Sequence, residues 1–383
     1  MSDMRWLFAT MHDVSRAASG GSYASRAYFE ALRTVLGSEV LVVAPEGSGS
    51  YFRSVGCAGV IECPARNWRQ RLRGLLGHDR DRIGTTLDRV RPEVRGFTPR
   101  LAVVDGGLMG GGVARLKCWG IPIVSLHHND ESEYKRYATG SRLISWDARR
   151  VQRYVLRTSA LGLVLTQRDA ERLGATEPCA PPLRVIGYGE AARPAPSAAL
   201  PRDCLRLSLT GNFGVAKGFS GLRVLAAYLR SAPATLPRHQ VFVGGHNMGV
   251  DMRAFCTQAK FEITENDDAL GRANVYVNPS EHPGGLKIRN CDGGRVGLPL
   301  LVHINSLPGF EMLADGAASY CSRLQFYEQL AALWGRISGG AYSRDALRQM
   351  YYREFSQEAL IQRLRVVFSD QMPLRSDSTI VGT

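Results

Sequence analysis

A glycine-rich stretch with one lysine is the first part of this sequence that could do chemistry. Residues 211–218 are Gly-Asn-Phe-Gly-Val-Ala-Lys-Gly and follow an apolar, strand-like run. Glycines let backbone amides approach an anion closely, and Lys217 adds a cation where a helix is expected to begin. The order Ala-Lys-Gly excludes a Walker loop, which requires Gly-Lys followed by Ser or Thr. The stretch is therefore a candidate phosphate site, although a tight turn with a solvated lysine has the same pattern.

The segment 278–292 holds the densest set of chemically useful residues. It is Asn-Pro-Ser-Glu-His-Pro-Gly-Gly-Leu-Lys-Ile-Arg-Asn-Cys-Asp, and it also follows an apolar run. Gly284 and Gly285 are expected at a helix start, where they would present amides to a diphosphate. Lys287 and Arg289 would add charge-assisted hydrogen bonds. The alternative is an ordinary solvated helix face.

Further polar residues stand near other strand ends. Asp292 is expected two turns into the same helix, where it could accept hydrogen bonds from a ribose diol. Gly20 and Gly21 come between the first apolar run and a helical stretch, and His127 and His128 close a strand-like run at 121–126. A glycine pair is also compatible with a simple turn, and a histidine at a strand end with a structural role.

Short apolar runs, each followed by a helix-compatible stretch, would position these residues. The runs lie at 6–10, 40–44, 101–104, 121–126, 161–166, 205–210, 240–243, 274–277 and 300–304. Nearly continuous apolar strands indicate sheets buried on both faces, and the alternation with helices indicates parallel βαβ units. Two such series predict an α/β protein with two doubly wound domains, whose ligands bind beyond the carboxyl ends of the strands.

Both glycine-containing segments resemble the donor-binding motifs of group-1 glycosyltransferases of the GT-B fold, the family-4-like retaining enzymes. The family's Gly-Arg-x4-Lys-Gly loop is matched by residues 211–218, with Lys217 at the phosphate-binding lysine and Asn212 where arginine is usual. The family's Pro-Ser, Glu-x7-Glu and Gly-x-Pro-Val frame is matched from residue 279 to 300, with Gly284 and Asp292 in the places of the two acids.

The resemblance implies roles for residues in both domains. The residues that would contact the donor diphosphate are Lys217, Gly284, Gly285, Lys287, Arg289, Gly20 and Gly21. The residues that would contact the nucleoside are Asp292 and Asn212. The first-domain glycine pair is similar to a family loop that faces the diphosphate and the acceptor. His128 resembles the histidine of a family His-Asn loop that contacts the donor sugar, and a one-residue shift would put His127 there instead. No residue is singled out as a catalytic base.

The expected fold is GT-B, with two Rossmann-like domains and a cleft between them. Residues 1–187 would form the acceptor-binding domain, 188–203 a Pro/Ala-rich linker, and 204–343 the nucleotide-sugar-binding domain. Residues 344–372 are expected to form a helix that crosses back to the first domain.

The expected activity is transfer of a hexose from a nucleotide-diphosphate donor to a glycan or lipid-linked acceptor. The resemblance implies retention at the anomeric carbon, no metal ion and no cofactor besides the nucleotide sugar, with a role in surface polysaccharide biosynthesis. UDP is the expected nucleotide and GDP an open alternative. The sugar, the acceptor and the oligomeric state are left open by the sequence.

Charge and composition bear on partners and location. The formal net charge of +13 implies an anionic partner, and the segment with Arg66, Trp68, Arg69, Arg71 and Arg73 is compatible with peripheral contact with an anionic membrane or with an ordinary solvated helix. The eight cysteines are scattered and form no CxxC pair, and the first residues lack the basic-then-apolar order of a signal peptide. Both features suggest a cytoplasmic location. If the membrane contact forms, the protein would lie on the inner face of the cell membrane.

Three other classes of protein share some of these features. A basic nucleic-acid-binding protein fits the charge, but the sequence has no helix-turn-helix, RRM or zinc-finger signature, so no nucleic acid is expected. A metal-dependent GT-A enzyme would need an Asp-x-Asp site after a strand, whereas residues 79–81 lie in an arginine-rich, helix-like stretch. A non-transferring GT-B enzyme of the epimerase type has the same fold and is not distinguished.

Overall fold

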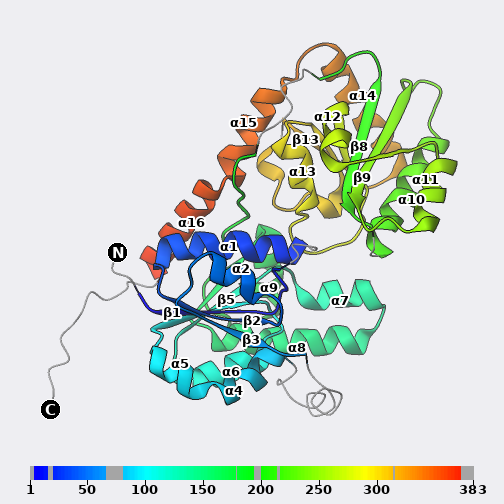
Figure 1. The fold of residues 1–383 in the computed structure, drawn as a ribbon. Helices are drawn as coiled ribbons and strands as arrows, with labels where there is room; N and C mark the ends of the chain where they lie inside the picture. The colour runs from blue at the N-terminus through cyan, green and yellow to red at the C-terminus, as the bar shows by residue number, and fades with distance from the viewer. Residues whose placement is uncertain are drawn as a thin grey trace, which may run out of the picture.

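The computed structural model describes residues 4–15, 20–65, 81–177, 179–193, 200–213, 216–313 and 315–371, with the backbone alone for 216–218. These residues form two units, each built on one sheet of parallel strands with helices packed on it (Figure 1). The predicted fold class, an α/β protein with two doubly wound Rossmann-like domains, is confirmed.

The first unit is a seven-stranded sheet with the order β3-β2-β1-β4-β5-β6-β7. Its strands are β1 (Trp6–Thr10), β2 (Val40–Pro45), β3 (Gly59–Cys63), β4 (Leu101–Asp105), β5 (Ile123–His127), β6 (Leu161–Val164) and β7 (Leu183–Val185). Its helices are α1 (Gly20–Leu36), α2 (Gly49–Ser54), α4 (Arg82–Arg89), α5 (Arg91–Phe97), α6 (Gly110–Cys118), α7 (Glu131–Thr139), α8 (Arg142–Thr158) and α9 (Gln167–Thr176). The last register pair of β1 and β4 joins Thr10 to Asp105, so these two strands end side by side.

The second unit is a six-stranded sheet with the order β10-β9-β8-β11-β12-β13. Its strands are β8 (Leu205–Asn212), β9 (His239–His246), β10 (Glu262–Thr264), β11 (Val275–Asn278), β12 (Leu300–His303) and β13 (Ala317–Tyr320). Its helices are α10 (Ala216–Arg230), α11 (Val250–Gln258), α12 (Asn266–Arg272), α13 (Arg289–Arg295), η1 (Ile304–Ser306), η2 (Glu311–Leu313) and α14 (Arg323–Ser338).

The chain ends in two helices where the sequence predicts one. α15 (Arg344–Phe355) and α16 (Gln357–Gln371) are separated by Ser356, whose backbone is extended. The backbone at this break pairs with Glu190. The Glu190 amide donates to Phe355 O at 2.9 Å, and the Gln357 amide donates to Glu190 O at 3.0 Å. The expectation of one continuous helix is therefore wrong. α16 lies along α1 of the first unit, where Gln357 Nε2 donates to Ala27 O at 3.0 Å (Figure 1).

Aromatic packing fixes the strand and the helix that flank the first strand end. Phe8 of β1 lies 5.1 Å from Phe29 of α1 between ring centroids, and Phe29 lies 4.9 Å from Phe52 of α2. All three side chains are fully buried. Burying large aromatic side chains is a major source of folding free energy, so this cluster holds the middle of α1 against β1.

Two predictions fall on parts of the chain that the structure does not describe. The basic segment with Arg66, Trp68, Arg69, Arg71 and Arg73 lies outside the described residues, and so does the side chain of Lys217. Within the described ranges, no helix has the length and apolar character that a membrane span requires.

Candidate functional site

A buried carboxylate stands at the carboxyl edge of the first sheet. Asp105, the last residue of β4, is fully buried. Its Oδ2 accepts hydrogen bonds from Thr10 Oγ1 at 2.7 Å and Ser25 Oγ at 2.6 Å, and its Oδ1 lies 2.6 Å from His128 Nε2. Burial alone would raise the pKa of Asp105, but the neighbouring His128, His12 and Ser25 lower it to about 2. Asp105 is therefore an anion at neutral pH that orients His128.

His12 completes this cluster from the loop after β1. Its ring centroid lies 4.7 Å from that of His128. Burial, then the neighbouring His128, lowers the pKa of His12 to about 4, so the ring is neutral at pH 7. The start of α1 approaches closely because Gly21 has no side chain, since an added Cβ would lie 2.7 Å from His12 Nδ1.

The spacing of these groups also resembles that of metal ligands. Ligand atoms of His12, Asp105 and His128 all lie within 4.8 Å of one another. Among the described residues, these three form the group whose spacing could hold a metal ion. Both oxygens of Asp105 already accept hydrogen bonds from the protein, Oδ2 from two hydroxyls. The arrangement therefore favours a hydrogen-bonded network that fixes a histidine ring.

The two neighbouring histidines point to different sides of the sheet. His127 is fully buried, with Nε2 at 3.0 Å from Ser125 Oγ and Nδ1 at 3.3 Å from Gln152 Nε2. Burial, then the neighbouring His128, lowers its pKa to about 3. Side chains alternate across a strand, so a cluster with His128 on one side leaves His127 in the packing on the other. Of the two sequence candidates, the geometry brings His128 to the site.

The glycine pair of the second unit lies directly against the first unit. Gly284 and Gly285 are buried, and an added Cβ on Gly285 would overlap Asn129 Oδ1 and lie 2.6 Å from His128 O. The Gly285 amide donates to the carboxylate of Asp169. The donor-type loop thus meets the histidine loop across the junction of the two units.

This loop is not the start of a helix, as the sequence analysis expected. Gly284 and Gly285 have φ values of 84° and 63°, and α13 begins only at Arg289. Left-handed backbone cannot continue into a right-handed helix, so the two glycines form a turn instead. Asp292, expected two turns into a helix, lies in the first turn of α13. In this conformation the Gly285 amide donates to the Asp169 side chain, so it does not point to a bound diphosphate.

Three of the predicted diphosphate and nucleoside residues gather at the carboxyl edge of the second sheet. The Lys287 ammonium donates to Gly284 O. The Arg289 guanidinium covers the end of β8, where an added Cβ on Gly211 would lie 3.6 Å from its Cζ. Next to it, Asn212 Oδ1 accepts from Asn247 Nδ2 at 3.2 Å. Gly20 reaches this edge from the first unit, since its Cβ would lie 3.8 Å from Ile288 Cδ1.

Asp292 already has protein partners. Thr210 Oγ1 lies 2.6 Å from its Oδ2, and Arg295 Nη1 lies 2.9 Å from its Oδ1. These contacts tie α13 to the end of β8. A ribose diol would have to share this carboxylate with Thr210 or displace it.

A pair of buried asparagines behind the loop was missed by the sequence analysis. Asn278 Nδ2 donates to Asn290 Oδ1 at 2.6 Å, and Asn290 Nδ2 donates to Ser306 O at 2.7 Å. Both side chains are fully buried. The bonds join the end of β11 to α13 and η1, so they hold the loop between them. Asp105 and His12 were also missed, although each stands at or just after a strand end, the place where chemistry was expected.

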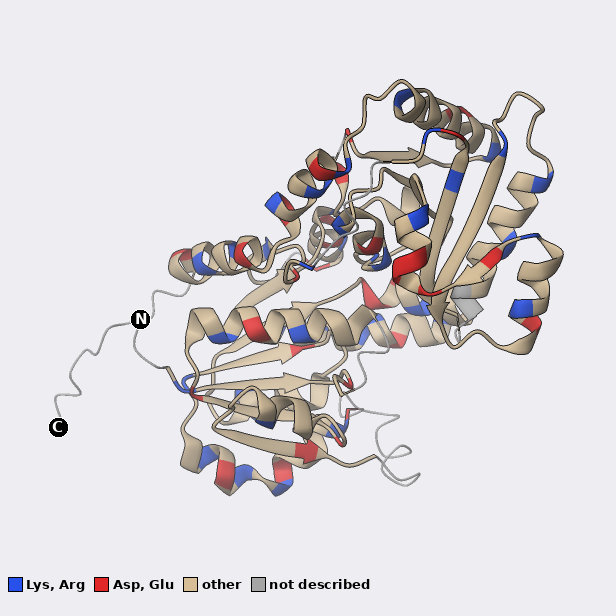
Figure 2. Cartoon of the chain, turned by 45° about the horizontal axis from the view of Figure 1, so that its top comes forward, with Lys and Arg blue, Asp and Glu red and all other residues tan. Residues whose placement is uncertain are grey.

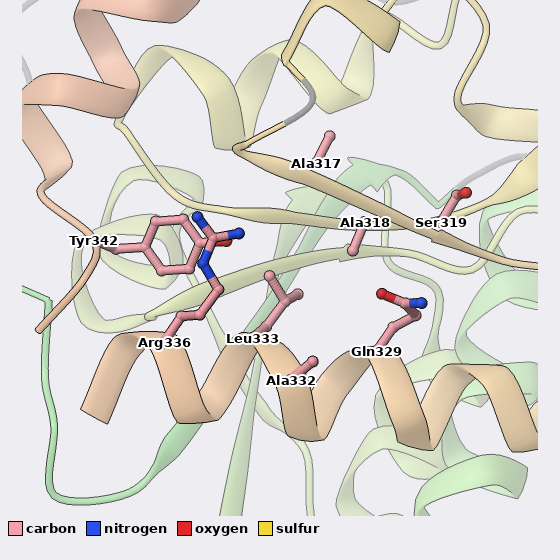
Figure 3. Close-up of a pocket in the computed structure, with 8 residues that line it drawn as sticks. All are labelled: Ala317, Ala318, Ser319, Gln329, Ala332, Leu333, Arg336 and Tyr342. Atoms are coloured by element: carbon pink, nitrogen blue, oxygen red, sulfur yellow. The ribbon is translucent and has the colours of Figure 1, made fainter. Parts of the chain in front are cut away.

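A separate cavity lies away from these residues. It has a volume of about 280 Å³ and lies between edge strand β13 and helix α14 (Figure 3). Its lining includes Ala318, Leu333 and Arg336, and the Arg336 guanidinium lies 4.4 Å from the centre of the Tyr342 ring. It includes none of the predicted site residues.

Both signs of charge occur along the described helices. In the view of Figure 2, basic and acidic residues are interspersed along the helices of both units. Several arginines are paired, for example Arg115 with Asp88 at 2.8 Å and Arg172 with Glu133 at 2.9 Å.

Comparisons with known proteins place the fold. Neither the protein-family models nor the curated protein sequences give a match to this chain. Solved structures do: a sucrose-phosphate synthase from Thermosynechococcus elongatus is 13% identical with a TM-score of 0.72, covering 97% of this chain and 100% of its own. The lipopolysaccharide outer core galactosyltransferase WaaB in its apo form is 12% identical with a TM-score of 0.69, covering 96% and 100%.

A third similar structure contains ligands. Anabaena HepE in complex with UDP and glucose is 11% identical with a TM-score of 0.68, covering 96% of this chain and 99% of its own. At these identities the similarity shows that the chain shares the two-domain fold of these proteins. It agrees with the predicted GT-B architecture.

Proposed function

We propose that this protein is a glycosyltransferase that moves a hexose from a nucleotide-diphosphate donor, in the first instance a UDP-sugar, to a glycan or lipid-linked acceptor. The observation that carries the proposal is the meeting of two strand-end loops. The Gly284-Gly285 turn of the second unit lies against the loop that holds His128 on Asp105 in the first unit. A glycine turn next to Lys287 and Arg289 and a fixed imidazole thus face the same junction.

The proteins that share the fold support the choice of donor. Structures of Anabaena HepE are described with UDP, with UDP-glucose, and with UDP and glucose. The neighbours also include a galactosyltransferase and a sucrose-phosphate synthase. We take UDP as the nucleotide of this chain by analogy with these complexes, with GDP as the alternative to be tested.

In the proposed reaction the second unit stabilises the departing diphosphate. Arg289 lies over the end of β8, and Lys217 follows that strand in the sequence. Fixed cations that meet charge as it develops lower the barrier, because they need no reorganisation during the reaction. Lys287 would join them after leaving the Gly284 carbonyl, and Asp292 and Asn212 would contact the nucleoside.

The first unit would position the sugar and the acceptor. Asp105 holds the ring of His128, which we assign to contact with the donor sugar. Gly20 and Gly21 let the start of α1 approach both His12 and Ile288. Closing the junction would exclude water and limit hydrolysis of the donor. Retention at the anomeric carbon follows from the family resemblance and is part of the proposal.

The wider role is proposed on the same basis. We assign the enzyme to surface polysaccharide biosynthesis, acting in the cytoplasm on acceptors at the inner face of the membrane. The residue boundaries 1–187, 188–203, 204–343 and 344–372 are proposed as acceptor domain, linker, donor domain and returning helical segment.

A thermal-shift screen tests the donor site. The purified protein is heated with UDP, GDP, their sugar conjugates or a short oligonucleotide, each with and without EDTA. The proposal expects stabilisation by one nucleoside diphosphate that EDTA does not abolish, because binding to the folded state raises the melting temperature. Stabilisation by the oligonucleotide alone, or only with divalent metal, would overturn it. Isomerisation of a stabilising UDP-sugar without an acceptor would instead support the epimerase alternative.

A further inference from the structure

Helix α8 faces the candidate site on one side and is exposed on the other. On its buried side, Gln152 Nε2 donates to Asn129 O at 2.8 Å, and Gln152 Oε1 accepts from the Glu131 amide at 2.9 Å. The helix therefore holds the loop that follows β5 and carries His128. The exposed side is not needed for that contact, so its composition calls for another explanation.

The exposed side of α8 combines large apolar and basic side chains. Leu143 and Trp146 are 78% and 63% exposed. Arg142 and Arg149 are exposed beside them and have no carboxylate partner in the part of the chain that the structure describes. Arg150 lies 5.9 Å from the centre of the Trp146 ring. Helical spacing places Leu143, Trp146 and Arg150 on the side opposite the buried one, and Arg142 and Arg149 complete the group of five at its edges. We call them the α8 patch.

The composition of the α8 patch fits one kind of partner best. Trp and Leu enter the interfacial zone of a bilayer, while arginines reach the phosphates around them. Anionic lipid adds attraction for each basic residue near the surface. A symmetric contact between two copies of this chain would bring the arginines of both patches together, which charge repulsion disfavours. We infer that the α8 patch docks on an anionic phospholipid surface.

The position of α8 gives this docking a use. Helix α7, which leads into α8, starts three residues after His128, and its Tyr137 ring lies 4.1 Å from the ring of His282 in the donor-type loop. Docking through α8 would therefore bring the junction of the two units close to the bilayer. The benefit for a lipid-linked acceptor rests on the proposed function, whereas the docking itself does not.

Vesicle sedimentation tests the docking without any assay of sugar transfer. The full chain is mixed at low salt with phosphatidylcholine vesicles, with or without phosphatidylglycerol. We expect binding to the anionic vesicles only, and a fall in partition of roughly tenfold for both L143S/W146S and R142E/R149E. High salt should weaken the binding of the wild type, because screening shortens the reach of exposed charges.

Matched variants separate the α8 patch from general surface effects. L324S/V366S removes two apolar side chains that are 67% and 60% exposed on other helices, and R95E/R365E makes the same charge change on α5 and α16. Both should bind like the wild type. Equal binding to neutral and anionic vesicles, or unchanged binding by the α8 variants, would overturn the inference.

Two further outcomes assign the patch to a different partner. The docking is refuted if the wild type does not bind vesicles but instead binds an oligonucleotide or forms a concentration-dependent dimer, and the α8 variants lose that binding or that dimer. Stabilisation by UDP should persist in all four variants. If UDP does not stabilise the wild type although the wild type binds vesicles, the proposed function is refuted and the docking still holds.

Discussion

The two sheet edges that meet at the junction are built in different ways. The first-unit edge holds buried titratable groups, with Asp105 bonded to Thr10, Ser25 and His128. The second-unit edge holds glycines with left-handed backbone and cations such as Arg289. One edge is organised by side-chain hydrogen bonds inside the protein, and the other by a glycine turn packed against the first unit and by nearby cations.

This difference suggests a division of labour. Buried, bonded groups keep one geometry and protonation state, which suits the positioning of a reacting sugar. Glycine turns and cations suit a diphosphate, which needs close approach and opposite charge. Substitutions on the first edge should therefore lower turnover more than nucleotide affinity, and some on the second should do the reverse.

Asp105→Asn should have the largest effect on turnover. The change removes the anion that orients His128, so kcat should fall by about 10²–10⁴-fold. UDP affinity, measured by calorimetry, should change little, because Asp105 belongs to the other edge. Asp88→Asn, which removes a surface carboxylate paired with Arg115, is the control. A parallel loss of UDP affinity would contradict the division of labour.

Lys217→Ala should come next. Loss of one transition-state charge partner typically costs ~2.7–4 kcal/mol, which corresponds to a fall of about 10²–10³-fold in kcat. The melting temperature should stay near that of the wild type. Lys117→Ala, at an exposed lysine of α6, provides the comparison. A folded variant with near-normal turnover would remove Lys217 from the donor site.

Gly285→Ala tests the contact between the two edges. The residue has φ of 63°, and an added Cβ would overlap Asn129. Gly120→Ala is a matched control, because its φ is 74° and nothing lies within 4 Å of its Cβ position. Both variants share the left-handed penalty of about 1–2 kcal/mol. Only Gly285→Ala should also lower kcat, measured with saturating donor. Equal effects of the two would mean that the contact is not needed.

Asp292→Ala should mainly weaken UDP. A hydrogen bond to a charged group contributes about 1.5 kcal/mol, so the Kd should rise roughly tenfold. Asp267→Ala removes another carboxylate near Arg295, one that is 92% exposed, and should leave UDP affinity unchanged. If Asp292→Ala instead lowers the melting temperature with normal UDP affinity, the residue serves only to tie α13 to β8.

His127→Asn should make the pH dependence of stability shallower. Burial lowers the pKa of His127 from 6.5 to about 3. Between these values the unfolded chain binds a proton that the folded chain does not, so stability is lost as the pH falls through this window. The slope from one such group is at most about 1.4 kcal/mol per pH unit.

Urea unfolding at several pH values between 4 and 7 measures that slope. The variant should show a shallower loss of free energy of unfolding than the wild type, while His12, whose pKa is lowered to about 4, keeps part of it. His246→Asn, at the exposed end of β9, is the control. An unchanged slope would show that His127 is not held neutral by its burial.

The sequence predicted the interior strands well and the edge strands not at all. All nine apolar runs correspond to strands inside the two sheets, such as β1 and β8. The four strands without a prediction, β3, β7, β10 and β13, are the four sheet edges. Edge strands are covered on fewer sides, as the exposed pattern of β7 shows, so their sequences lack the continuous apolar run that reveals a buried strand.

The site was predicted in part for a similar reason. Glycines and cations near strand ends give a local sequence signal, and Gly285 and Arg289 were found that way. The cluster around Asp105 depends on β1, β4 and β5 being neighbours, since Asp105 is more than twenty residues away in the chain from each of its partners. The choice between His127 and His128 depends on which side of the strand faces the junction. A shift of one residue in the expected strand exchanges the two sides, so the sequence alone does not decide between them.

Hydrogen exchange with and without UDP-glucose tests the location of the donor most directly. The account predicts added protection at the ends of β8 and β11, in the loop 283–289, and in the loop after β5 of the first unit. Protection on both edges would show that the donor lies at the junction. Protection confined to the cavity between β13 and α14, or no protection at concentrations that saturate binding, would contradict the account.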